Sequence, residues 1–256
     1  MSFWDHLDVL RGTIFRSVGA ILGISVIFLC IKEPFFRVIL WPSSPDFILY
    51  KWLGLDFSMD IINIEVSAQF FVHLKMAVLA GVVVAFPYVV WEIWRFIEPA
   101  LYDRERKPAG KAFLLSSGLF YLGVAVGYFI VLPVCLIFFM NYSVSEAVTN
   151  SVSLSSYISM FISMVFLIGL VFEFPTVVMI LSGMGLLDRN QLRSGRKYAV
   201  VVILILSALI TPSDPVSMVV LAVPLYGLYE FSILVAANNK TDNKQEEEEV
   251  TDDIGQ

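Results

Sequence analysis

Charged residues are scarce in this chain. Only 16% of its 256 residues are Asp, Glu, Lys or Arg, against about 25% in an ordinary soluble domain. Hydrophobic residues reach 58%, and the mean hydropathy is +0.79. A water-soluble fold is excluded, because it could not hide so much apolar surface. Six membrane-spanning helices of about 20 residues need roughly 120 residues, so the length fits an all-α integral membrane protein with several spans.

Cysteine and histidine are nearly absent, with two residues of each. Cys30 and Cys135 lie inside apolar runs and are expected to be small buried side chains, while His6 and His73 have no partner at metal-ligand spacing. Neither a disulfide framework nor a metal site is expected. The chain also lacks a Gly-rich phosphate loop, HExxH, GxSxG and paired intramembrane aspartates. We therefore expect no enzyme, no cofactor and no nucleic-acid partner.

The hydrophobic pattern predicts one membrane domain over residues 1–236. Its six helices are expected at about 13–31, 67–94, 112–140, 155–181, 198–210 and 216–236. The last two are short. Residues 198–210 reach only about 20 Å, against a hydrocarbon core of about 30 Å, so they must thin the bilayer, lean on protein or fail to span. A Pro-rich turn at residues 211–215 separates these two helices.

The positions of lysine and arginine predict that both termini are cytoplasmic. Thirteen of the seventeen lie in the N-terminal lead, after the second and fourth spans, or in the tail. Only Lys32, Arg37 and Lys51 lie on the other side, and cytoplasmic loops carry the excess of positive charge. Residues 237–256 carry five of the six net negative charges and are expected to form a disordered cytoplasmic tail.

Two segments flank the first span. Residues 1–18 mix charged, aromatic and aliphatic side chains, which predicts an amphipathic lead-in lying at the membrane interface. The outer loop of residues 32–66 contains Trp41, Trp52 and several prolines. This loop is expected to cap the outer face with short helices.

Two acidic residues stand inside apolar runs. Glu173 has 26 uncharged residues before it and 14 after it. Because a charge near the bilayer centre is costly, such an acid usually marks a pathway or a partner site. A structural alternative is a polar knot at the carbonyl of Val171, which Pro175 leaves without its helical donor. Glu230, toward the cytoplasmic end of the last span, either has a function or reaches the lipid headgroups.

The segment Trp91–Lys111 has the densest chemistry in the chain. It combines an aromatic belt with four acids, Glu92, Glu98, Asp103 and Glu105, that alternate with arginines. A plain interfacial loop with solvated charges would have the same belt. The carboxylates, however, are not needed for membrane orientation and suit a cationic ligand, since a guanidinium pairs with a carboxylate in a fork geometry.

Five motifs, in order, resemble the TatC family, the polytopic core of the twin-arginine protein translocase. They cover the chain to about residue 236 and read His6-Leu7-x-x-Leu10-Arg11, Pro87 with Trp94-x-Phe96-x-x-Pro99-x-Leu101-Tyr102-x-x-Glu105, Gly123-x-x-x-Gly127-Tyr128-Phe129, Phe172-Glu173-x-Pro175, and Thr211-Pro212-x-Asp214 with Pro224 and Glu230. Each motif alone is weak, but their order and spacing are specific. The resemblance implies a concave, six-span architecture in the bacterial inner membrane.

The resemblance also implies a function and its residues. TatC-like proteins bind signal peptides that carry two adjacent arginines. Together with single-span TatA and often TatB partners, in an oligomeric complex, they move folded proteins across the membrane using the proton-motive force. By resemblance the signal-binding residues are Asp8, Arg11, Phe96, Pro99, Leu101, Tyr102 and Glu105. Glu173 is then the intramembrane polar site, and the partner-docking residues are Thr211, Asp214 and Met218.

Two positions depart from the family pattern. Where relatives usually carry a glutamate near the N-terminus this chain has Val9, with Asp8 one residue earlier, and one residue turns a helical side chain by about 100°. Either Asp8 substitutes for that glutamate, or one acid fewer faces the arginine pair. Met218 replaces a common glutamine and removes an interhelical hydrogen bond of about 0.5–2 kcal/mol.

The alternative function for this chain is an ion-coupled small-molecule transporter that uses Glu173, and an intramembrane enzyme ranks third.

Overall fold

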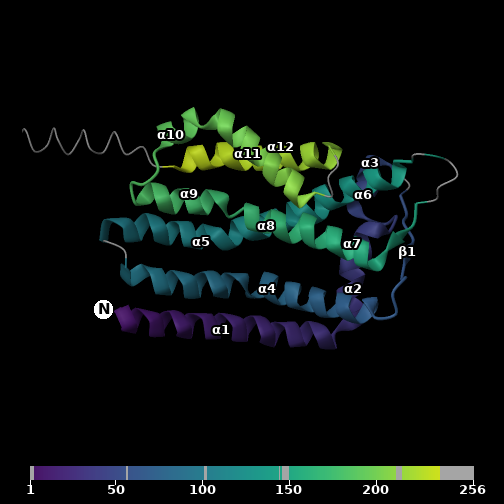
Figure 1. The fold of residues 1–256 in the computed structure, drawn as a ribbon, viewed down its shortest axis with the longest axis horizontal. Helices are drawn as coiled ribbons and strands as arrows, with labels where there is room; N and C mark the ends of the chain where they lie inside the picture. Colours follow the sequence, from purple (N-terminus) through teal and green to yellow (C-terminus); the bar gives the residue numbers. More distant parts are fainter. Residues whose placement is uncertain are drawn as a thin grey trace, which may run out of the picture.

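The structure is a computed structural model that describes residues 3–55, 57–100, 103–143, 145, 150–211 and 215–236. Its long helices lie side by side along the long axis of the molecule (Figure 1). They are α1 (Phe3–Cys30), α4 (Ala68–Ile97), α5 (Asp103–Val126), α9 (Phe174–Gly183), α11 (Arg196–Ile210) and α12 (Pro215–Val235). From α1 to α9 the neighbours follow chain order, because α1 packs on α4, α4 on α5 and α5 on α9. The order then reverses, since α12 packs on α9 and α11 packs on α12.

Shorter elements complete the chain. They are α2 (Lys32–Leu40), η1 (Trp41–Ser43), α3 (Ile48–Leu53), β1 (Ile61–Ile62), η2 (Glu98–Ala100), η3 (Gly127–Val131), α6 (Leu132–Asn141), β2 (Val152–Ser153), α7 (Leu154–Phe161), η4 (Ile162–Leu167), α8 (Ile168–Val171) and α10 (Arg189–Ser194). We call the end of the bundle where α1 begins and α12 ends the terminal end. The opposite end, with α2, α3 and β1, is the loop end (Figure 1).

Among the residues that the structure describes, five helical stretches are long and apolar enough to cross a membrane. They are Leu7–Cys30, Ala68–Ile97, Ala109–Asn141, Leu154–Gly183 and Ser217–Val235. The predicted fifth span is the helix α11, whose 15 residues reach about 22 Å. This helix packs against α12. Packing against protein is one of the three ways, named above, in which so short a helix can be accommodated.

The N-terminal lead-in is not a separate element. α1 runs unbroken from Phe3 to Cys30, so the lead-in continues the helix of the first span, and its position at the membrane interface stays a prediction. No glycine or proline breaker interrupts the sequence strongly enough to turn it, since Gly12 is tolerated inside a helix at a cost of about 1 kcal/mol. Cys30, at the end of α1, is exposed and not buried as expected, whereas Cys135 is buried.

Glycines set the closest helix contacts. A Cβ on Gly81 of α4 would lie 2.1 Å from Ser25 Oγ and 2.7 Å from the Ile21 carbonyl oxygen of α1. A Cβ on Gly127 of η3 would lie 2.3 Å from the Met164 carbonyl oxygen of η4. Small residues permit such backbone approach between membrane helices, where apolar side chains gain little from leaving lipid.

The outer loop does form the expected cap of short helices at the loop end. Three buried tyrosines fasten it: Tyr50 donates to the Pro42 carbonyl at 2.6 Å, Tyr128 to Val38 at 2.6 Å and Tyr157 to Ile39 at 2.7 Å. The last two donate to carbonyls near the end of α2, of which the Val38 carbonyl also accepts the backbone N–H of Trp41. Burial raises the pKa of the Tyr50 hydroxyl, which therefore stays protonated and able to donate.

A short parallel strand pair, which the sequence pattern did not predict, adds to this cap. Ile61 of β1 pairs with Val152 of β2, and Ile62 pairs with Ser153. The pair ties the loop before α4 to the start of α7. Two residues per strand are too few to show an alternating pattern in the sequence.

Candidate functional site

The predicted signal-binding residues gather at the terminal end of the bundle. The start of α1, the end of α4 and the start of α5 all lie there (Figure 1). Asp8 and Arg11 are exposed on α1, Phe96 is half-buried at the end of α4, and Pro99 is exposed in η2. Glu105 belongs to the first turn of α5, but its side chain, like Leu101 and Tyr102 as a whole, lies outside the described residues.

An ion pair with a buried carboxylate joins α1 to α4 near this end. Glu92 is 1% exposed, and its Oε2 accepts from Arg16 Nε at 2.9 Å and from Nη2 at 2.8 Å. Tyr88 donates to Oε1 at 3.2 Å, and Arg16 Nη2 also donates to Thr13 Oγ1 at 3.3 Å. A carboxylate removed from water needs both charge and hydrogen-bond partners. Glu92 has them, so the pair fixes the two helices relative to each other.

A second, more open pair lies in the connection between α4 and α5. Arg106 of α5 donates through Nε to Glu98 Oε1 of η2 at 2.7 Å, and its Nη2 donates to the same oxygen. Glu98 is 31% exposed and Arg106 is 54% exposed. The connection thus already contains a carboxylate that holds a guanidinium at the edge of solvent.

Glu173 lies between helices, away from the terminal-end residues. Pro175 ends α8 at Val171 and begins α9 at Phe174, as expected from its missing N–H. Ser116 of α5 donates to Glu173 Oε2 at 2.6 Å. Glu173 Oε1 is buried and has no hydrogen-bond partner within the part of the chain that the structure describes. The site therefore has unused acceptor capacity.

Glu230 pairs with protein. Its Oε2 accepts from Arg196 Nη2 at 2.7 Å, and its Oε1 accepts from the Tyr226 hydroxyl at 2.9 Å. Arg196 begins α11 and Glu230 lies near the end of α12, so the pair closes the short helical hairpin at the terminal end. This contact gives Glu230 a structural role.

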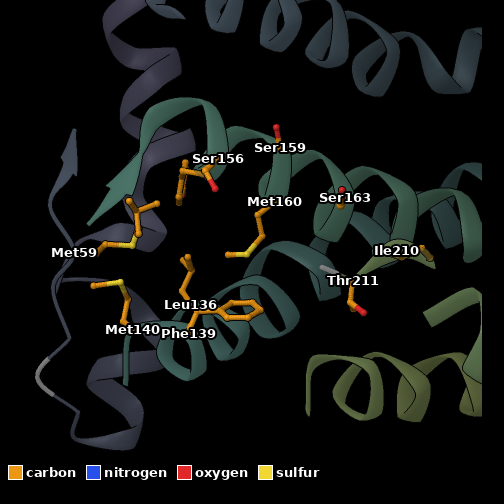
Figure 2. A pocket seen from close by; sticks show the side chains of 12 residues that line it. Met59, Leu136, Phe139, Met140, Ser156, Ser159, Met160, Ser163, Ile210 and Thr211 are labelled. Atoms are coloured by element: carbon orange, nitrogen blue, oxygen red, sulfur yellow. The ribbon is translucent and has the colours of Figure 1, made fainter. Parts of the chain in front are cut away.

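A pocket of about 370 Å³ opens at the loop end. Figure 2 shows Met59, Met140 and Met160 directed toward it, with Ile210 and Thr211 at the end of α11 closing one side. Thr211 is buried, and its hydroxyl donates to the Ser207 carbonyl at 2.9 Å. Of the other two predicted docking residues, Met218 is half-buried on α12, and Asp214 lies outside the described residues.

Three separate places thus carry the predicted residues: the terminal end, the Glu173 site and the loop-end pocket. Sequence reasoning did not single out the pairs Arg16–Glu92 and Glu98–Arg106, nor the partner of Glu173. One signal was available, since Arg16 and Glu92 are each flanked by apolar residues of a predicted span or its edge, where a charge calls for a partner. Across the described residues no group of three or more His, Cys, Asp or Glu could hold a metal ion.

The row of apolar helices and its partnered internal charges define a multi-pass helical membrane protein. The family model described as Sec-independent protein translocase protein (TatC) matches residues 5–224. The chain belongs to the TatC family, and it is therefore a component of the twin-arginine protein translocase in the bacterial inner membrane.

Individual relatives agree over most of their length. The TatC proteins of Blattabacterium sp. subsp. Periplaneta americana and of Desulforapulum autotrophicum are each 34% identical to this chain. The first match covers 92% of this chain and 95% of the relative, and the second covers 98% and 91%. A crystal structure of the twin-arginine translocase receptor TatC in DDM superposes with a TM-score of 0.75 at 33% identity, covering 91% of this chain and 99% of that one.

Family membership decides between the function classes. A translocase component is a transport protein and not an enzyme. Membership of the TatC family therefore favours protein transport over the alternative of a small-molecule transporter. The all-α membrane fold expected from the sequence is confirmed by the helices and by the match to TatC crystal structures.

Proposed function

We propose that this chain is the signal-peptide receptor of its translocase, with the terminal end of the bundle facing the cytoplasm. Glu105 is the principal acid for the paired arginines of the signal. Asp8 and Arg11 contribute from α1, and Phe96, Pro99, Leu101 and Tyr102 shape the site. Arginine is the expected ligand group because its planar fork matches a carboxylate and stays charged at all physiological pH values.

One observation carries the proposal: carboxylates at this end of the fold already hold arginines. Glu92, which is 1% exposed, binds Arg16, which is 45% exposed, and Glu98 binds Arg106 in a pair whose two side chains are both partly exposed. The local structure is therefore compatible with a solvent-accessible guanidinium bound to a buried or a partly exposed carboxylate. A cationic peptide would meet the same chemistry here.

Partner subunits belong to the other two places. We assign Glu173, with its unused oxygen, to a transmembrane helix of TatA or TatB. The loop-end pocket, which Thr211 lines, is assigned to the outer end of such a helix, with Asp214 and Met218 as further docking residues. Methionine side chains adapt to partners of different shape, which suits the Met-lined pocket to this task. The assembly is an oligomer with TatA and TatB, set in lipid, and the proton-motive force drives transport of folded cargo.

A peptide titration tests the receptor assignment. The full-length protein in lipid nanodiscs is titrated with a fluorescent signal peptide bearing Arg-Arg and, separately, with its Lys-Lys twin. Tight binding that is selective for arginine and is lost in Glu105→Gln is expected. Equal binding of both peptides, or unchanged binding by Glu105→Gln, would contradict the proposal. Glu65→Gln, which removes an exposed carboxylate at the loop end, is the matched control.

Pocket filling tests the docking assignment. Ser163→Phe places a ring in the loop-end pocket and is expected to reduce copurification of a TatA-type partner. Ser58→Phe adds the same ring at an exposed position outside the pocket lining and is expected to leave copurification unchanged. Equal recovery of the partner with both variants would rule out docking in this pocket.

A further inference from the structure

We propose that Glu98 is a second arginine-binding carboxylate of the signal-peptide site, and that Arg106 is an internal arginine which a signal-peptide arginine displaces. The inference rests on the proposed receptor function and deepens it.

Two of the arginine pairs at the terminal end, Arg16–Glu92 and Glu98–Arg106, differ in how easily they open, and a third, Arg196–Glu230, closes the hairpin of α11 and α12. Glu92 is 1% exposed, so removing Arg16 would leave a carboxylate out of water without its counter-ion, at a high cost. Glu98 is 31% exposed and Arg106 is 54% exposed. An exposed pair of this kind contributes little net stability, because water solvates both partners when they separate. Of these two pairs, only Glu98–Arg106 can therefore exchange its arginine for another at low cost.

The contacts of Glu98 leave room for exchange. Both donors of Arg106, Nε and Nη2, go to the single oxygen Oε1. A guanidinium that approaches along the other carboxylate oxygen can bind before Arg106 has left. Exchange then replaces one charge-assisted hydrogen bond by another of the same type, with no interval in which Glu98 is unpaired.

The position of Glu98 also suits a pair of adjacent arginines. Side chains of successive residues point to opposite sides of an extended peptide, so two neighbouring arginines are met best by acids on two different elements. Glu98 lies in η2, and Glu105 lies in the first turn of α5. Arg106 follows Glu105 directly and reaches back to Glu98, which brings the first turn of α5 within one arginine length of η2. One arginine would bind each element.

Arg106 then acts as an internal competitor. While Arg106 occupies Glu98, a lysine or a single arginine of an unrelated peptide must first displace it. The new contact with Glu98 is then offset by the lost contact between Glu98 and Arg106, so the net binding free energy is small. A signal with two arginines gains two guanidinium–carboxylate contacts at once, because the second binds at the effective concentration set by the first. The pair thereby raises the selectivity of the site for adjacent arginines.

Single and double variants of the full-length chain in nanodiscs test this, with the Arg-Arg peptide as the probe. We expect Arg106→Gln to bind roughly three- to fivefold more tightly, because the competitor is gone, and Glu98→Gln to bind roughly five- to tenfold more weakly. In the double variant Glu98→Gln/Arg106→Gln, the gain from removing Arg106 should be absent. Arg95→Gln removes the same charge from an exposed arginine that lies over the Trp91 ring and should change the affinity less than about twofold.

The outcomes separate the inference from the function on which it rests. If Arg106→Gln tightens binding equally with and without Glu98, a general gain in negative potential explains the effect and the exchange is overturned. Weaker or unchanged binding by Arg106→Gln also overturns it, as does unchanged binding by Glu98→Gln. If Glu105→Gln leaves arginine-selective binding intact, or if the wild type does not distinguish Arg-Arg from Lys-Lys, the receptor proposal itself fails.

Discussion

Arg16 of α1 and Glu92 of α4 form a salt bridge at 2.8 Å in which the carboxylate is 1% exposed. Together with the close approach of Gly81 to Ile21 and Ser25, it fixes α1 at two heights along α4. Most of the remaining surface of α1 faces away from the protein, since only 17% of its span is buried. These two contacts are among those that position the N-terminal segment, with Asp8 and Arg11, against α4.

Removing the cation from this pair should destabilise the protein more than removing the pair. Arg16→Leu leaves Glu92 buried and unpaired, and we expect the thermal unfolding midpoint in detergent to fall by more than about 5 °C. Arg16→Leu/Glu92→Leu should recover most of that loss, because no buried charge remains. Arg11→Leu, an exposed arginine of the same helix that lies over the Phe15 ring, is the control. A double variant that is less stable than Arg16→Leu would contradict this account.

Gly81 should resist substitution by even one carbon atom. A Cβ there would lie 2.1 Å from Ser25 Oγ and 2.7 Å from a backbone oxygen, and the backbone cannot move aside as a side chain can. We expect Gly81→Ala to lower the free energy of unfolding by about 1–3 kcal/mol. Denaturant unfolding of the purified protein measures this.

Gly118 of α5 should tolerate the alanine substitution that Gly81 does not. Nothing lies within 4 Å of the position that a Cβ on Gly118 would take. Gly118→Ala should therefore be neutral or stabilise the helix by up to about 1 kcal/mol, since alanine has the higher helix propensity. Equal effects of the two glycine substitutions would show that helix propensity, and not the contact between α1 and α4, determines the stability at these positions.

The tyrosine contacts at the loop end predict a third result. Tyr157→Phe keeps the buried ring but leaves the Ile39 carbonyl without its donor, which should cost about 1–3 kcal/mol of unfolding free energy. Limited proteolysis should then cut within residues 32–66 faster than in the wild type. Tyr142→Phe changes an exposed tyrosine and should leave both measurements unchanged. Unaltered proteolysis of Tyr157→Phe would mean that packing alone holds the cap.

The sequence predicted the helices well and the contacts between them poorly. Apolar runs as long as Ser67–Trp94 have few alternatives to a membrane helix, and the helix α4 at Ala68–Ile97 overlaps this run. The pair Arg16–Glu92 joins residues 76 positions apart, and no local pattern specifies which acid an arginine meets across two helices. The same holds for Ser116 and Glu173, which lie 57 positions apart. The sequence could predict that the terminal-end residues lie near one another only because α1, α4 and α5 are consecutive membrane helices that run in alternating directions. The start of α1, the end of α4 and the start of α5 therefore lie at the same end of the bundle (Figure 1).

Glu173 and Ser116 allow the partner role of the intramembrane acid to be separated from a structural one. Glu173→Ala removes both carboxylate oxygens, including the buried Oε1 that accepts no hydrogen bond from the described residues. Loss of a hydrogen bond to a charged group costs about 1.5–3 kcal/mol, or roughly ten- to hundredfold in affinity. We expect copurification of a TatA-type partner to fall accordingly, and Glu173→Gln, which keeps an acceptor and adds a donor, to retain part of it.

Ser116→Ala supplies the decisive comparison, because it removes only the internal donor at 2.6 Å and leaves the carboxylate in place. If Glu173 serves a partner helix, Ser116→Ala should lower the thermal stability slightly while most of the partner still copurifies. If the carboxylate is a structural knot between α5 and α9, Ser116→Ala and Glu173→Ala should lower stability alike, and neither should change partner recovery at a temperature where both variants are folded. Measuring thermal unfolding and copurification on the same preparations distinguishes the two, since a partner contact changes the second readout and an internal knot changes the first.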